Sequence, residues 1–108
     1  MHFIKRSLIR DEWQHIMKLT LQLRGPLAKK FKNGTIEIEL HNGAVLSDLL
    51  TQLIESEDSV RGVWESPEVI DRDALILCND TDVGLSGGLD TKLSEGDIVT
   101  VLPLIHGG

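Results

Sequence analysis

Two stretches near the start of the chain alternate between apolar and polar residues. Every second residue of 17–23 is apolar, and the same holds for 36–40. A period of two is typical of a strand with one buried face. Between the stretches, Gly25-Pro26 and Asn33-Gly34 favour turns. The pattern predicts an antiparallel hairpin with one dry face.

The next segment has helical spacing instead. Its apolar residues fall at i, i+3, i+4, i+7 and i+8: Leu46, Leu49, Leu50, Leu53 and Ile54. This spacing predicts an amphipathic helix of about two turns, with its apolar stripe on the dry face of the hairpin. Ser47 and Asp48, close to its start, suit the positive end of the helix dipole.

Residues 55–73 are irregular and rich in acidic side chains. We expect Trp64 and Val69-Ile70 to anchor this excursion, which has room for a short second helix. The apolar run Ala74–Cys78 then reads as a short, well-buried strand. It is followed by turn residues, from Asn79-Asp80 to the glycines of 84–88.

The last regular element predicted is a strand over residues 98–102. It follows Ser94-Glu95-Gly96-Asp97, where Gly96 can take a left-handed conformation. Pro103 cannot donate to a ladder and should end the strand. The order is therefore β-β-α-β-β, and a right-handed crossover places the last strand parallel to the first, in the middle of a mixed sheet. This is an α+β, β-grasp arrangement with one main helix across the sheet.

Residues 1–16 are harder to assign. Their apolar residues fall near helical spacing: Ile4, Leu8, Ile9, Trp13 and Ile16. Translation could also begin at Met17, at the start of the first strand. We therefore divide the chain into an N-terminal extension of uncertain role, 1–16, and one domain, 17–108.

Composition narrows the classes of function. A chain of 108 residues with 41% apolar content supports a single modest core. A net charge of −6 argues against direct nucleic-acid binding, and the lysines at 29, 30 and 32 are expected at a solvated hairpin tip. Without an apolar run of about 18 residues, no membrane span is expected. The charged N-terminus lacks a signal-peptide pattern, and the single Cys78 fits a reducing compartment, so we expect a cytoplasmic location.

The candidate chemistry lies at Gly107-Gly108, which follows a strand, a proline and a short tail. Without a Cβ, two glycines can thread a narrow channel and present a carboxylate. Attack of that carboxylate on the α-phosphate of ATP would give an acyl-adenylate, from which a sulfur nucleophile could displace AMP. The catalytic groups of this scheme belong to a partner enzyme, so the chain would be a carrier and no enzyme.

Three segments carry a family resemblance: Asn79-Asp80, Leu93–Asp97 and the ending His106-Gly107-Gly108. They resemble the ubiquitin-related modifiers and sulfur carriers over about residues 17–108. That superfamily includes Urm-type carriers for tRNA thiolation, the small subunit of molybdopterin synthase and the thiamin-pathway sulfur carrier. Leu102-Pro103 is similar to the molybdopterin-synthase subunit, whereas the His-Gly-Gly ending is similar to the Urm-type modifiers.

The resemblance implies roles for the C-terminal residues. Gly108 would carry the adenylate and then a thiocarboxylate or an isopeptide bond, with Gly107 and His106 threading behind it. Val99 and Val101 should face the helix. A partner-docking patch would consist of Thr100, Leu102, Leu104 and Ile105. The alternative is that Leu102, Leu104 and Ile105 simply close the core.

The resemblance also implies partners. An E1-like adenylating enzyme with sulfurtransferase activity would consume the ATP, and no cofactor would be bound by the chain itself. The sulfur acceptor would be a tRNA thiolase, with lysine-bearing proteins as possible conjugation targets. The alternative acceptor is the large subunit of molybdopterin synthase. An alternative of another class is a non-covalent β-grasp interaction domain with an incidental Gly-Gly ending.

Other sites are less favoured by the residues. The four histidines His2, His15, His41 and His106 share no ligand spacing. Asp80–Gly84 resembles the start of a calcium loop but lacks its third acidic position and closing Glu, which favours a turn. The segment 84–88 has no following Lys and is no phosphate loop. Cys78 lies in an apolar strand, where cysteine usually acts as a small hydrophobe.

Overall fold

The computed structural model describes residues 16–104, without the side chain of Lys32; the remaining residues at both termini lie outside the described part. The strands are β1 (Ile16–Leu23), β2 (Thr35–His41), β3 (Ala74–Cys78), β4 (Thr81–Asp82) and β5 (Ile98–Pro103). The α-helices are α2 (Leu46–Ser56), α3 (Asp58–Arg61) and α4 (Pro67–Asp73). Short 3-10 helices connect them: η1 (Pro26–Lys30), η2 (Lys32–Gly34), η3 (Val83–Leu85) and η4 (Gly88–Asp90).

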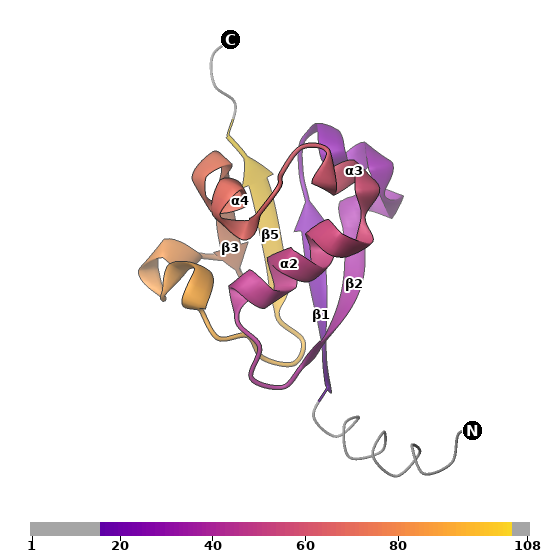
Figure 1. The fold of residues 1–108 in the computed structure, drawn as a ribbon. Helices are drawn as coiled ribbons and strands as arrows, with labels where there is room; N and C mark the ends of the chain where they lie inside the picture. The colour runs from indigo at the N-terminus through magenta and orange to yellow at the C-terminus, as the bar shows by residue number, and fades with distance from the viewer. Residues whose placement is uncertain (1–15, 105–108) are drawn as a thin grey trace, which may run out of the picture.

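The strands form one mixed sheet in the order β2-β1-β5-β3-β4. β1 pairs antiparallel with β2, and the register places Leu19 opposite Ile38. β5 runs parallel to β1, with Thr20 opposite Ile98, and antiparallel to β3. The last long strand therefore lies in the middle of the sheet, and α2 crosses one face (Figure 1). This confirms the predicted β-grasp arrangement.

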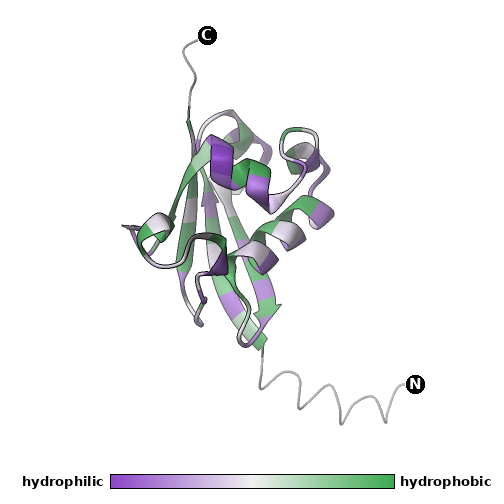
Figure 2. Cartoon of the chain, turned by 60° about the vertical axis from the view of Figure 1, so that its left-hand side comes forward, coloured by the Kyte–Doolittle hydropathy of each residue, from purple (hydrophilic) through white to green (hydrophobic). Residues whose placement is uncertain are grey.

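The core lies between α2 and the sheet face that it covers. All five residues of the predicted helical stripe are buried. The alternating residues of β1, from Met17 to Leu23, are at most 3% exposed. Hydrophobic and hydrophilic residues alternate along the strands in Figure 2, as expected for a sheet with one covered face. At the start of α2, Asp48 Oδ2 accepts a hydrogen bond of 2.9 Å from the Val45 N–H, so its carboxylate satisfies one free backbone donor.

The excursion between α2 and β3 is more ordered than predicted, since it contains both α3 and α4. Trp64 is 3% exposed and Ile70 fully buried, while Val69 packs partly against the core. The Ser66 hydroxyl accepts a hydrogen bond from the Val69 N–H and caps α4. These anchors confirm the expectation and hold α3 and α4 against the core.

Two predicted boundaries shift by one residue. β1 begins at Ile16 and not at Met17, because Ile16 already pairs with His41. β5 includes Pro103, which pairs with Ala74. Gly96 has φ +85°, the left-handed conformation that the sequence indicated.

The predicted burial of β3 is wrong in part. Ala74 and Ile76 are buried, but Leu75 is 37% exposed, and Leu77 and Cys78 are half-buried. The reason is that β3 has only one covered face, so every second residue points away from α2. In the described ranges of the chain, no helix has the length and apolar character needed to cross a membrane.

Candidate functional site

The place where the chain leaves the sheet is held firmly. The Leu104 N–H donates a hydrogen bond of 2.8 Å to the Asp73 carbonyl, and the Arg24 N–H donates one of 3.1 Å to the Val101 carbonyl. A Cβ added to Gly25 would stand 3.4 Å from Pro103 Cγ, so the β1–η1 turn lies directly against the end of β5. The base of the tail is therefore fixed in position. The proposed reactive residue Gly108 lies outside the described residues, as do Gly107, His106 and Ile105.

Within β5, alternate residues point to opposite faces of the sheet. Val99 and Val101 are fully buried toward α2, as expected. Thr100 and Leu102 belong to the opposite, open face. Thr100 is only 8% exposed, and its Oγ1 donates a hydrogen bond of 3.3 Å to Gln22 Oε1. Leu102 is half-buried, so it offers more contact surface than Thr100.

Sequence reasoning missed three residues of the open face, Leu75, Leu77 and Ile98. The β3–β5 register places Leu75 opposite Leu102 and Leu77 opposite Thr100. Ile98 follows on the same face and is 41% exposed. We call the set Leu75, Leu77, Ile98, Thr100 and Leu102 the open-face patch. Residues 74–78 are all apolar, so the sequence does not show which of them point away from α2. The antiparallel pairing with β5 is needed to identify Leu75 and Leu77.

For Leu102 and Leu104, the two described residues of the alternative in which the end of β5 closes the core, that role finds no support in the packing. Leu104 is 50% exposed. Neither Leu102 nor Leu104 belongs to the buried cluster or to the half-buried residues packed on it. Both apolar side chains therefore lie on the surface, close to the base of the tail.

Cys78 has the character of a structural thiol. Its Sγ donates to Asp97 Oδ2 at 3.6 Å. Burial, with a smaller contribution from the Asp97 carboxylate, raises the pKa of this thiol to about 11. The nucleophilic form of cysteine is the thiolate, so the surroundings of Cys78 suppress nucleophilic reactivity.

The turn after β3 has structural hydrogen bonds as well. Asp82 Oδ1 accepts one of 2.8 Å from the Gly84 N–H, which stabilises the start of η3. Among residues 16–104, no group of three or more His, Cys, Asp or Glu side chains could hold a metal ion. His41 lies on β2, whereas His2, His15 and His106 lie outside the described residues.

Comparison with known proteins agrees with this geometry. Residues 22–108 match the ThiS family. The sulfur carrier protein CysO of Mycobacterium tuberculosis is 42% identical over 72 residues, which cover 61% of this chain and 70% of that protein. The ubiquitin-related modifier 1 homolog 1 of Arabidopsis thaliana is 32% identical over 101 residues, which cover 85% of this chain and 100% of that protein.

Solved structures share the fold. The small archaeal modifier protein 1 of Methanosarcina acetivorans superposes with a TM-score of 0.69 at 20% identity, covering 87% of this chain and 99% of that one. A chain of the BexX/CysO complex of Amycolatopsis orientalis superposes with a TM-score of 0.60 at 24% identity, covering 83% and 99%. Both are β-grasp neighbours, and the second was solved with a protein partner.

Proposed function

Because this chain belongs to the ThiS family, within the superfamily of sulfur carriers and ubiquitin-related modifiers, we propose that it is a sulfur carrier of the Urm type. In this proposal the Gly108 carboxylate is the reacting group. An E1-like enzyme activates it, a tRNA thiolase receives its sulfur, and protein lysines are additional acceptors. The observation that carries the proposal is the family match, which extends through Gly108, together with a rigid base for the tail at Leu104.

The proposed chemistry takes place on the partner. A Gly108 carboxylate oxygen attacks the α-phosphorus of ATP, and pyrophosphate leaves. A persulfide of the activating enzyme then attacks the acyl carbon and displaces AMP. A second enzyme thiol cleaves the sulfur–sulfur bond and is oxidised to a disulfide, which releases the thiocarboxylate. The chain contributes a thin, unhindered terminus and a surface for docking, and ATP is consumed by the enzyme.

Sequence similarity supports the carrier role at two levels. The CysO relative is named a sulfur carrier, and the Arabidopsis relative is named a modifier. The thiocarboxylate accounts for both names, because it can donate sulfur or be activated for amide formation. Structures of molybdopterin-converting factors are 21–22% identical, a likeness that shows the fold alone. Supply of sulfur to a molybdopterin-synthase large subunit is the second candidate, because Leu102-Pro103 is similar in sequence to the molybdopterin-synthase small subunit.

The test is the chemical state of the terminus in the native cell. Intact-mass spectrometry of the purified protein should show a fraction in which one C-terminal oxygen is replaced by sulfur. Loss of the activating enzyme should remove this fraction. If thiolated tRNA persists after deletion of the carrier gene while molybdenum cofactor is lost, the second candidate is correct. A terminus that is always an ordinary carboxylate, with no conjugates on denaturing gels, would leave only a non-covalent interaction domain.

The cytoplasm is the proposed location, because the tRNA and the reducing conditions that the chemistry needs are found there. Cys78 is a free thiol, which suits a reducing compartment. Fractionation of cells that express a tagged carrier would test this, with the tag at the N-terminus so that Gly108 stays free.

A further inference from the structure

An apolar groove lies beside the end of β5. Its volume is about 660 Å³, and its apolar lining consists of Pro26, Leu27, Val63, Trp64, Pro103 and Leu104. These residues come from η1, from the segment after α3, and from Pro103 at the end of β5 with Leu104 directly after it. No residue of the open-face patch lines it. The groove is therefore a second surface at the base of the tail.

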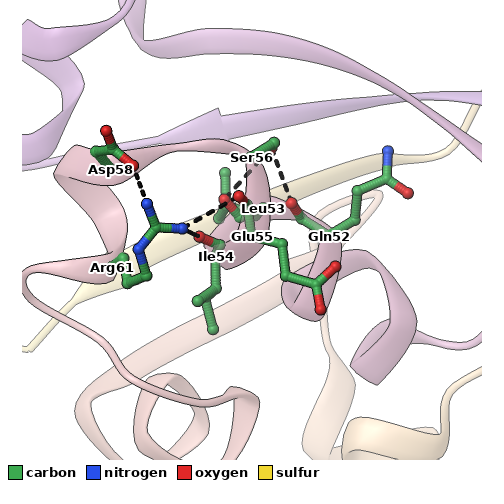
Figure 3. A network of polar contacts seen from close by, with 7 residues as sticks. All are labelled: Gln52, Leu53, Ile54, Glu55, Ser56, Asp58 and Arg61. Atoms are coloured by element: carbon green, nitrogen blue, oxygen red, sulfur yellow. Dashed lines mark hydrogen bonds and ion pairs between the residues drawn. The ribbon is translucent and has the colours of Figure 1, made fainter.

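The wall of the groove that contains Val63 is fixed before any partner binds. Arg61 donates hydrogen bonds of 3.1 Å to the carbonyls of Ile54 and Glu55, the last turn of α2, and its guanidinium pairs with Asp58 (Figure 3). These contacts tie α3 to the end of α2. The Trp64 N–H donates to the Val60 carbonyl at 2.8 Å. The groove is thus built into the fold.

Its floor and rim differ in exposure. Trp64 is 3% exposed and Leu27 8%, whereas Val63 is 56% and Leu104 50% exposed. The floor is part of the core, but two large apolar side chains at the rim remain in contact with water. Their burial by a partner would be favourable, and contiguous exposed apolar surface often marks an interaction site.

The carboxylates that line the groove are already paired with cations, so they do not favour a charged occupant. Asp58 pairs with Arg61, and Asp73 pairs with Arg72. The remaining charged lining residue is Lys30. Because the two carboxylates already have cationic neighbours, the occupant that suits the groove best is an apolar side chain.

The length of the tail indicates where this side chain comes from, if the proposed function holds. Four residues, 105–108, follow Leu104 in the sequence, and an extended chain of four residues spans at most about 14 Å. An enzyme that encloses Gly108 together with ATP must therefore bring the mouth of its channel close to Leu104. Leu104 belongs both to the tail base and to the groove.

We propose that the groove receives an aliphatic or aromatic side chain from the channel mouth of the activating enzyme. The inference rests on the proposed function. In this arrangement the enzyme grips the base of the tail from two sides, with the open-face patch on one and the groove on the other. Two separated contacts would orient the tail along the channel better than one.

The test uses the full chain and its E1-like enzyme. Pyrophosphate exchange, measured against carrier concentration, gives KM and kcat for adenylation. Val63→Asp places a charge at the rim and should raise KM about tenfold or more with little change in kcat. Val63→Thr keeps the side-chain shape and should raise KM less. The matched control is Leu85→Asp, since Leu85 is 83% exposed and lies in η3, away from the groove.

Circular dichroism and thermal melts should show that all three variants fold like the wild type. An unchanged KM for Val63→Asp would overturn the inference. A lower KM would overturn it too, because it would mean that the chain's own Ile105 occupies the groove and competes with the enzyme. If the wild-type chain is not adenylated at all, it is the proposed function that fails.

Discussion

Leu75 and Leu102 lie directly opposite each other across the antiparallel β3–β5 ladder. Both side chains point away from α2, because their neighbours Ile76 and Val101 are buried beneath the helix. A cross-strand apolar pair on an exposed sheet face contributes little to the core. Its position beside the tail base makes it the natural centre of the open-face patch.

We predict that Leu75→Asp and Leu102→Asp each weaken adenylation, with a KM at least tenfold higher. The reason is that a charge in the patch must lose water when a partner docks. Ile16→Asp is the matched control. Ile16 is 37% exposed, as Leu75 is, and it lies on the same face of the sheet, but at the start of β1 and far from the base of the tail. Pyrophosphate exchange measures all three. Equal KM values for Leu75→Asp and Ile16→Asp would refute the docking role of the patch.

Removal of Gly108 should abolish adenylation and sulfur loading. Its effect on stability should be negligible, because the core cluster of the described residues consists of side chains between Met17 and Val101. The measurements are intact mass after incubation with the activating enzyme and ATP, and the thermal midpoint. A truncated chain that still accepts sulfur would contradict the role of Gly108.

The periodic segments were predictable from the sequence, because their patterns report burial directly. The stripe from Leu46 to Ile54 and the alternation of β1 each mark one buried face. β3 was predictable as a strand but not in its burial, since an apolar run does not say which of its residues face solvent. The open-face patch could therefore be predicted only in part.

The groove could not be predicted at all. Its apolar lining comes from three segments far apart in the chain: η1, the residues after α3, and the end of β5 with Leu104 directly after it. Whether they enclose a space depends on how α3 is held on α2, for which Arg61 is responsible. No local pattern in the sequence reports such a contact. The turn at Asn79-Asp80 was predictable, because Asn and Asp tolerate the positive φ that both residues adopt, but the hydrogen bonds that stabilise it were not.

Asp97 holds that turn together. Its Oδ1 accepts a hydrogen bond of 2.9 Å from the Asn79 side chain, and its Oδ2 accepts one of 2.7 Å from the Ser94 N–H. Asn79 Oδ1 in turn accepts the Ile98 N–H at 2.9 Å. We predict that Asp97→Ala lowers the free energy of unfolding by about 1–3 kcal/mol. Urea denaturation measures this, with the exposed Asp90→Ala as control; equal losses in both variants would contradict the role of Asp97.

The Cys78 thiol should react slowly in the folded protein. A pKa raised to about 11 reduces the thiolate fraction at neutral pH roughly 100-fold relative to an ordinary cysteine. Alkylation with iodoacetamide should be slow at pH 8 and accelerate up to about pH 11. The urea-unfolded chain provides the reference rate. Similar rates in the folded and unfolded chains would show that Cys78 is not shielded.

The same shift predicts a dependence of stability on pH. The folded pKa lies above the unfolded one, so the unfolded chain loses this proton first as the pH rises. The Cys78 thiol therefore leaves the free energy of unfolding unchanged below about pH 9 and lowers it as the pH rises toward 11. Cys78→Ala should remove this part of the decline. A decline of the same size in Cys78→Ala would assign it to other groups.

Gly34 connects the hairpin turn to the groove, because it packs against η1. It has φ +69°, and an added Cβ would stand 2.6 Å from the Leu23 carbonyl oxygen and 3.0 Å from Ala28 Cβ. Gly43 has a similar φ of +92° but no atom within 4 Å of an added Cβ. Gly43→Ala should therefore cost only the left-handed backbone strain, about 1–2 kcal/mol, while Gly34→Ala should cost clearly more and displace η1. Urea denaturation compares the two free energies of unfolding, and adenylation at a temperature where both are folded should show a raised KM for Gly34→Ala alone. Equal free energies of unfolding of the two variants would mean that η1 can move to make room for the added methyl group, and the groove would then not be rigid.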